Sequence, residues 1–350
     1  MEPSKKILSE QETRITTGND ESLTTSETRA KRGRISRMLK EIRKDTPQIT
    51  VERARLLTES FQKTEGKPVV MRWALALKNI LSKIDIHINA DELIVGRCSP
   101  PGLYGILYPE LRGAWLEKGI ESFPTRKEGR FTISDKDIQT IRDTIIPYWK
   151  GRTVFEVNYD LLPIETRNVL YDEHDPYTPS YAVIDSTTDR SSQQWVPDYT
   201  KVLKVGFKGI RKEAEERLQA LDPFEPENNI EKRPFLKAII IVCKAMVKFG
   251  GRYADLARKM ADNESDKTRK EELLLVAANC DKVPGEPADS FLEAIQSQWF
   301  TQVGFRFEQM HGGTIGNGRI DQYLYPYYKN DIEKGRSTMM IFLKYWNIFG

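Results

Sequence analysis

The sequence predicts an α/β fold in which helices dominate and strands are few, short and buried. Apolar residues recur at helical spacing in most segments between residues 35 and 303, and only Glu92–Gly96 reads as a short apolar strand that ends in glycine. Hydrophobic residues make up 39% of the 350 positions and aromatic residues 10%, which is enough for a substantial core. No internal repeat or Gly/Ser linker divides the chain, so we expect residues 31–336 to belong to one domain.

Charge and cysteine content exclude several classes of protein. With 30% charged residues, the composition is not that of a membrane protein. The 54 basic and 51 acidic side chains nearly balance, which argues against a dedicated nucleic-acid-binding protein. The three cysteines form neither a Cys-x-x-Cys pair nor a zinc-binding spacing, and the N-terminus has no apolar signal segment. We therefore expect a cytoplasmic protein with no metal site and with neither a nucleic-acid nor a membrane partner.

The N-terminal residues are first polar and then basic. Residues 1–30 carry almost no aliphatic side chains, so they cannot bury enough apolar surface to fold, and we expect a disordered tail. Between Ala30 and Lys44, basic residues are interleaved with Ile35, Met38 and Leu39 at helical spacing. This pattern fits either a nucleic-acid patch or the solvated face of an N-terminal helix, and the helix is the favoured interpretation.

The chain is then predicted to run through a series of helices. Thr50 is placed to cap a helix from Val51 to Phe61, without the acidic partner of a full capping box. Residues 171–199 are rich in Tyr, Asp, Pro, Ser and Thr and show no period, so we expect a long loop, which in a compact protein is often functional. The other helices are expected over Val69–Lys83, Asp135–Trp149, the stretch after Pro163, Asp198–Ala220, Pro234–Glu264, Ser265–Asn279 and Pro287–Val303.

A glycine-rich loop, His311-Gly-Gly-Thr-Ile-Gly-Asn-Gly-Arg319, shares only part of a phosphate-binding motif. Gly313 and Gly318 have the spacing of a P-loop, but Arg319 and Ile320 stand where that motif has Lys and then Ser or Thr. The amine that reaches the phosphates and the hydroxyl that binds magnesium are both missing. The sequence therefore predicts a sharp turn or a close backbone approach here, and no nucleotide site.

The segments around this loop follow a characteristic order. Arg319-Ile-Asp-Gln-Tyr-Leu-Tyr-Pro-Tyr-Tyr328 is followed by Asp331-Ile-Glu-Lys-Gly335. Upstream lie Trp149–Thr153, Asp198-Tyr199, Val202-Leu203, Gly206–Ile210, Gly250–Ala254, Phe291-Leu-Glu-Ala-Ile-Gln296 and Phe305-Arg306-Phe307-Glu308. Each piece alone is weak, but in this number and order, over residues 35–336, they resemble the pyruvate formate-lyase-like glycyl radical enzymes.

This resemblance implies the N-terminal portion of a ten-stranded α/β barrel, mostly helical in this segment. It also implies an anaerobic lyase, typically homodimeric, in which a thiyl cysteine abstracts a hydrogen from the substrate and a glycine stores the radical. A separate iron–sulfur, S-adenosylmethionine activating enzyme installs that radical. Cys98, Cys243 and Cys280 do not stand in the Cys-x-Glu setting of the family, and no Arg-x-x-Gly-Tyr loop occurs. No catalytic residue is therefore assigned in this chain, no cofactor is expected to be bound to it, and the cysteines are expected in the core.

The substrate class is expected to depend on the loop before Asp198-Tyr199. In the diol dehydratases of the family a histidine lies four residues before this pair and binds a substrate hydroxyl, whereas Gln194 stands there in this chain and Arg190 lies four residues earlier. This arrangement resembles the family members that cleave isethionate (2-hydroxyethanesulfonate) to acetaldehyde and sulfite. A guanidinium suits an anionic sulfonate, and a glutamine bonds oxygens without adding charge. We expect Arg190 and Gln194 to bind substrate, with a solvent-exposed loop as the alternative, and Trp195 either to wall the pocket or to pack in the core.

Residues 337–350 depart from the family pattern, which continues with an acidic amphipathic helix. The apolar run after Ser337, read one base earlier with plausible codons, would give such a helix, so we hypothesise a frameshift or assembly break there. The sequence thus predicts the N-terminal part of an isethionate-cleaving glycyl radical lyase, inactive by itself. Two alternatives stay open: a fragment of a diol or hydroxyproline dehydratase or an arylacetate decarboxylase, and a non-catalytic partner of a separately encoded C-terminal half.

Overall fold

The computed structural model describes residues 33–34, 36–40, 46–111, 113–171, 195–308 and 315–336, and it divides the chain into two units, residues 1–40 and 41–350. In the first unit residues 33–34 and 36–40 are helical, as the spacing of Met38 and Leu39 predicts. The predicted tail over residues 1–30 and the apolar segment 337–350 lie outside the described residues, as does most of the predicted loop over 171–199.

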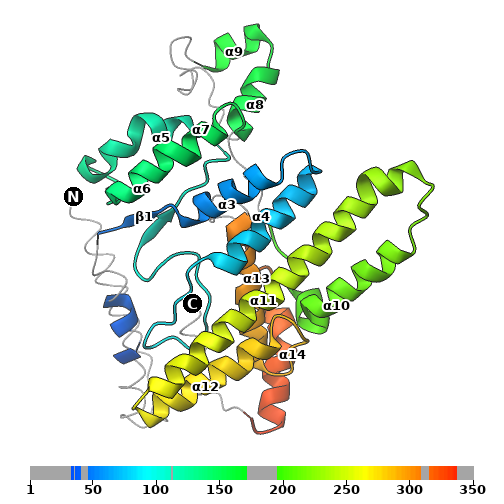
Figure 1. The fold of residues 1–350 in the computed structure, drawn as a ribbon. Helices are drawn as coiled ribbons and strands as arrows, with labels where there is room; N and C mark the ends of the chain where they lie inside the picture. The colour runs from blue at the N-terminus through cyan, green and yellow to red at the C-terminus, as the bar shows by residue number, and fades with distance from the viewer. Residues whose placement is uncertain are drawn as a thin grey trace. The chain divides into compact units, whose positions relative to one another are not determined.

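The second unit is mostly helical (Figure 1). Among its described residues, two short strands, β1 (Gln48–Thr50) and β2 (Tyr104–Ile106), pair in parallel with Gln48 opposite Tyr104. The helices are α3 (Glu52–Lys63), α4 (Val69–Lys83), α5 (Ala114–Gly119), η1 (Ile120–Thr125), α6 (Asp135–Thr140), η2 (Ile141–Ile145), α7 (Ile146–Trp149), α8 (Val154–Leu161), α9 (Ile164–Leu170), α10 (Tyr199–Gln219), η3 (Asn228–Lys232), α11 (Arg233–Asn263), α12 (Lys267–Lys282), α13 (Phe291–Glu308) and α14 (Ile320–Glu333). None of the described helices is both long and apolar enough to cross a membrane.

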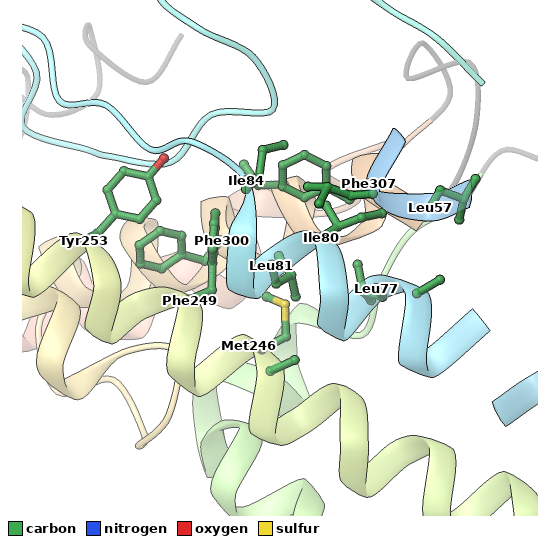
Figure 2. Packing of buried hydrophobic residues seen from close by; sticks show 14 of the residues in the cluster. Leu57, Leu77, Ile80, Leu81, Ile84, Met246, Phe249, Tyr253, Phe300 and Phe307 are labelled. Carbon is green, nitrogen blue, oxygen red and sulfur yellow. The ribbon is translucent and has the colours of Figure 1, made fainter. Parts of the chain in front are cut away.

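The core of this unit is built around α11, which packs against α4, α10, α12 and α13. Figure 2 shows side chains from α3, α4, α11 and α13 meeting in one cluster. Phe249 of α11 lies at its centre, with its ring centroid 5.2 Å from that of Tyr253 and 5.6 Å from that of Phe300, both at steep interplanar angles. Edge-to-face aromatic pairs of this kind add to the stabilisation from burial. The core therefore ties the N-terminal helices to α13, which lies far along the chain.

Most of the helices predicted from apolar spacing are confirmed. The helix over Val69–Lys83 has the predicted bounds, and α3 begins one residue later than predicted. Thr50 belongs to β1, yet its hydroxyl accepts a hydrogen bond from the Glu52 N–H at 3.4 Å, so it still serves the start of α3. The predicted helix over Asp135–Trp149 is helical throughout, with a π-helical turn, η2, before the proline at position 147.

The predicted strand over Glu92–Gly96 is wrong, and the reason lies in a side chain on α13. The N–H of Val95 donates to Oε1 of Gln296 at 2.9 Å, and Nε2 of Gln296 donates to the Val95 carbonyl at 2.6 Å. A glutamine amide thus satisfies the backbone groups that a neighbouring strand would otherwise pair. The side chains of Leu93, Ile94 and Val95 are buried as predicted, but the backbone runs irregularly.

The predicted helix over Asp198–Ala220 is interrupted at Gly206. Asp198 caps α10 by accepting from the Lys201 N–H at 3.0 Å. At Gly206 the backbone has φ +62° and ψ 172°, a conformation that is essentially restricted to glycine. Beyond this kink, the N–H of Phe207 donates to the Pro284 carbonyl and that of Lys208 to the Gly285 carbonyl, both at 2.9 Å. The kink therefore docks α10 onto the segment that joins α12 to α13.

Two adjacent glycines on α11 give a stability prediction with a built-in control. A Cβ on Gly250 would lie 2.9 Å from Pro284 Cδ and 3.0 Å from the Cys280 carbonyl oxygen, whereas a Cβ on Gly251 would meet nothing within 4 Å. Gly250→Ala is expected to lower the free energy of unfolding by about 1–3 kcal/mol. Gly251→Ala is expected to raise it by up to about 1 kcal/mol, because alanine is the better helix former. Urea unfolding of the two variants followed by circular dichroism tests this, and equal effects would contradict it.

Candidate functional site

The candidate site lies where the segment that begins at Trp195 meets the glycine-rich loop. Trp195 and Ile315 form a parallel bridge, and the Gly316 N–H donates to the Trp195 carbonyl at 2.8 Å. Gly318 has φ +61°, and a Cβ there would lie 2.7 Å from Val196 Cγ1. The close backbone approach predicted for this loop is therefore present, and its partner is the segment after residue 194.

A cleft of about 420 Å³ opens between the start of α10 and the start of α14. The described residues that line it are Val196, Pro197, Asp198, Tyr199, Thr200, Leu203, Lys204, Arg319, Gln322, Tyr323, Pro326 and Tyr327. Three tyrosines and two prolines are among the lining residues, and two cations and one carboxylate contribute charge. A volume of this size accommodates a small organic molecule.

The tyrosines of the cleft are neutral hydrogen-bonding groups. Burial raises the pKa of Tyr199 to about 12, although a hydrogen bond with Gln298 acts in the opposite direction. Burial also raises the pKa of Tyr323, whose hydroxyl donates to the Asn317 carbonyl at 2.8 Å. The rings of Tyr199 and Tyr323 lie 5.4 Å apart. Because both phenols stay protonated at neutral pH, they can orient a ligand but cannot act as bases.

The charged side chains of the cleft are partly engaged with one another and with backbone. Arg319 pairs with Asp321, with 2.8 Å between its Nη2 and Oδ2, and both are exposed. The carboxylate of Asp198 accepts from the Lys201 N–H at the start of α10. Of the described residues that line the cleft, none is a cysteine or a histidine. The described lining therefore offers groups that bind and orient a molecule.

Of the three predicted substrate-binding residues, only Trp195 belongs to the described part of the chain. Arg190 and Gln194 lie outside it, so their assignment stays a prediction. Trp195 is 42% exposed and does not pack in the core; the next residue, Val196, lines the cleft. Tyr199 and Tyr323 belong to the sequence motifs described above, which assign them no role, and the amide of Gln298 was not predicted to be functional. No sequence signal distinguishes that amide, because the predicted helix over Pro287–Val303 carries several other polar side chains, among them Gln296 and Gln302.

All three cysteines lie in the described part of the chain, and none of them lines the cleft. Cys243 and Cys280 are 2% exposed within the core, and burial raises the pKa of Cys243 to about 12. The sulfur of Cys98 packs beneath α13, 3.8 Å from the Val303 carbonyl, and burial raises its pKa to about 12 as well. The expectation that none of the three cysteines is catalytic stays a prediction, and no step of a radical reaction is assigned to them.

Comparison with protein families and with curated proteins places the chain among known relatives. A family model described as pyruvate formate lyase-like matches residues 23–342. The isethionate sulfite-lyase of Desulfovibrio desulfuricans is 48% identical over 305 residues, which cover 87% of this chain and 37% of that protein. That of Bilophila wadsworthia is 45% identical over 306 residues, with the same coverage. The trans-4-hydroxy-L-proline dehydratase of Clostridioides difficile is 33% identical over 83% of this chain and 36% of its own length.

Solved structures give the same picture of the fold. A glycyl radical enzyme from Archaeoglobus fulgidus superposes with a TM-score of 0.80 at 34% identity, over 90% of this chain and 40% of that one. The B12-independent glycerol dehydratase of Clostridium butyricum gives a TM-score of 0.78 at 37% identity, over 85% and 37%. The chain thus spans a little over a third of the length of the relatives that it matches, and its fold is that of the corresponding part of a glycyl radical enzyme barrel.

Proposed function

The chain belongs to the pyruvate formate lyase-like family, and on this premise we propose that it is the N-terminal, substrate-binding part of a glycyl radical lyase that cleaves isethionate to acetaldehyde and sulfite. One observation carries the choice of substrate. Four isethionate sulfite-lyases are 44–48% identical to the chain, whereas three curated dehydratases are 31–33% identical and the glycerol dehydratase of known structure is 37% identical.

In this proposal Arg190 binds the sulfonate and Gln194 bonds the substrate hydroxyl or a sulfonate oxygen. A guanidinium is always charged and presents several N–H donors in one plane, which matches a cluster of anionic oxygens. Trp195 follows directly and adds an aromatic surface beside the cleft, where the neutral phenols of Tyr199 and Tyr323 hold the adjoining segments. The chain binds and orients the substrate and contributes no catalytic residue.

The other parts of the enzyme are proposed as follows. A glycyl radical, installed by an iron–sulfur, S-adenosylmethionine activating enzyme, would supply the radical to the thiyl cysteine that abstracts a hydrogen from the substrate. Both groups would lie in loops that this sequence does not contain. Residues 31–336 form the N-terminal part of one catalytic domain, preceded by the tail of residues 1–30 and followed by the apolar residues 337–350. The complete enzyme is an anaerobic cytoplasmic homodimer, and the chain by itself has no activity.

A fusion enzyme tests the function directly. The chain through residue 336 replaces the corresponding part of the Desulfovibrio desulfuricans isethionate sulfite-lyase, and the product is activated without oxygen. We expect release of sulfite and acetaldehyde from isethionate, and none from the isolated 350-residue chain. Dehydration of 1,2-propanediol or hydroxyproline in place of sulfite release would overturn the substrate assignment. Restored activity on mixing the chain with the separate remainder of that lyase would favour complementation by a second polypeptide.

Arg190→Lys in this fusion enzyme is expected to lower kcat/KM for isethionate by roughly 10–100-fold. Lysine keeps the positive charge but loses the planar set of donors, and one or two charge-assisted hydrogen bonds are worth about 1.5–3 kcal/mol. Arg217→Lys is the matched control, because Arg217 is exposed in the last turn of α10. Steady-state sulfite release measures both variants. Equal kinetics of the two would place Arg190 outside the binding site.

A further inference from the structure

Two glutamines on α13 are completely buried and point to opposite sides of the helix. Gln296 and Gln298 are both 0% exposed, and residues two apart on a helix project in nearly opposite directions. Gln296 pins the irregular segment at Val95, as described above. Burying a second amide on the other side costs free energy unless it makes hydrogen bonds. The contacts of Gln298 therefore indicate what that amide does.

Gln298 lies beneath the glycine-rich loop and beside the cleft. Its Nε2 donates to Asn317 Oδ1 at 2.8 Å and more weakly to Gln302 Oε1 at 3.4 Å. Gln298 also acts against the effect of burial on the pKa of Tyr199, whose hydroxyl donates weakly to the Gly316 carbonyl at 3.5 Å. The Oε1 of Gln298 is buried and has no hydrogen-bond partner among the described residues. The Gln298 amide thus bonds the loop at Asn317, and Tyr199 at the start of α10 bonds the same loop at Gly316.

The loop passes this restraint on to the segment after residue 194. Gly316 donates to the Trp195 carbonyl at 2.8 Å, and Gly318 lies against Val196 without room for a Cβ. The Tyr323 hydroxyl holds the Asn317 carbonyl from the other side, at 2.8 Å. The loop is therefore clamped between α13, α14 and the Trp195–Val196 backbone.

From this geometry we infer that Gln298 is a positioning residue for substrate binding. Its amide holds Asn317 and thereby fixes the glycine-rich loop. The loop in turn holds the backbone of Trp195. The inference rests on the proposed function, because the Trp195–Val196 backbone that the loop holds borders the cleft proposed to bind substrate. Gln298 itself does not line the cleft and is not expected to touch the substrate.

The first test measures the clamp on the full chain, without any activity. Gln298→Leu removes the side-chain amide and keeps a side chain of similar size. Hydrogen exchange of the backbone amides in the peptide that contains Gly316 is then followed by mass spectrometry. We expect exchange of the Gly316 amide to accelerate by roughly tenfold, because the loop loses its anchor. Gln296→Leu is the matched control, with the same residue type, helix and burial, and is expected to accelerate exchange near Val95 and not at Gly316. Equal exchange at Gly316 in both variants would overturn the inference.

A second variant keeps the test valid if Gln298→Leu disturbs the core. Asn317→Ala removes the partner of Gln298 from a half-buried loop position and leaves α13 intact. It is expected to accelerate Gly316 exchange to the same extent, and the double variant is expected to add nothing further, because both changes break one contact. Full additivity would show that the two residues act independently, which contradicts the clamp.

The kinetic consequence is tested in the fusion enzyme. Gln298→Leu is expected to raise KM for isethionate by roughly tenfold while changing kcat by less than about threefold, and Gln296→Leu is expected to leave KM unchanged. Unchanged KM in Gln298→Leu would overturn the positioning role. A fusion enzyme with the unaltered chain that releases no sulfite from isethionate would instead overturn the proposed function, while the exchange experiment still decides the clamp.

Discussion

Arg53→Met is expected to lower the free energy of unfolding by about 3–5 kcal/mol, because it leaves the carboxylate of Glu110 buried without its partner. The two residues are 0% and 2% exposed, and the Nη2 of Arg53 lies 2.6 Å from Oε1 of Glu110. When one member of a buried ion pair is removed, the desolvation cost of the other member is no longer offset by an attractive partner. Few single substitutions in this chain are expected to cost more.

The guanidinium of Arg53 is engaged on several sides. Its Nε donates to the Phe307 carbonyl at 2.8 Å and its Nη1 to the Leu107 carbonyl at 3.3 Å. The same group stacks over the ring of Tyr108, 4.1 Å from the centroid. A methionine fills part of this space but satisfies none of these acceptors, so the loss includes two backbone carbonyls as well as the carboxylate.

Urea unfolding of the chain, with the folded fraction measured by pulse proteolysis, quantifies the effect. The double variant Arg53→Met, Glu110→Leu is expected to be more stable than Arg53→Met alone, because no charge then remains buried. Lys212→Met is the control, since its pair with Glu216 is well exposed, at 76% and 64%, and such pairs contribute little. A loss below about 1 kcal/mol in Arg53→Met would mean that the pair is solvated in the folded chain.

Gly206→Ala is the second substitution for which we expect a large effect, a loss of about 3–6 kcal/mol. A Cβ at this position would lie 2.2 Å from the Gly285 carbonyl oxygen, which is backbone and cannot rotate away. The conformation at Gly206 also belongs to glycine alone, so strain adds to the clash. The two hydrogen bonds from Phe207 and Lys208 to the segment after α12 are expected to break with it.

Gly66→Ala separates the two contributions. Gly66 has φ +79°, and a Cβ there would meet nothing within 4 Å, so only backbone strain of about 1–2 kcal/mol is expected. The same unfolding measurement serves both variants. If Gly206→Ala cost no more than Gly66→Ala, the close approach of α10 to Gly285 would not exist in solution.

The helices were predictable where one face is apolar along several turns, as in Val69–Lys83, because burial on one side imposes a 3.6-residue period. Strands β1 and β2 were missed because three residues are too few to show a period. Helix α8 was also missed, although Thr153 and Glu156 form the capping box that marks its start. The segment at Val95 was misread because its backbone partner is a side chain on a distant helix, which no local pattern encodes.

The candidate site was predictable only in part, and through motif order. The Asp198–Tyr199 pair and the segment after Arg319 were recognised from their place in a series of motifs, and the structure brings them to the same cleft. The role of Gln298 was not predictable from sequence, because the sequence does not distinguish a buried glutamine on a helix from a solvent-exposed one. Its importance depends on its hydrogen bond with Asn317, which lies 19 residues further along the chain.

The bond from Arg53 to the Phe307 carbonyl also sets an order of events during synthesis. These residues are 254 positions apart, and at translation rates of about 5–20 residues per second the acceptor emerges roughly 13–50 s after the donor. Glu110 and Leu107 arrive much earlier, so the nascent chain holds the cation with an incomplete set of partners for most of that interval. Helix α3 can reach its final packing only when the ribosome has made the end of α13, because Phe307 supplies one acceptor of the Arg53 guanidinium.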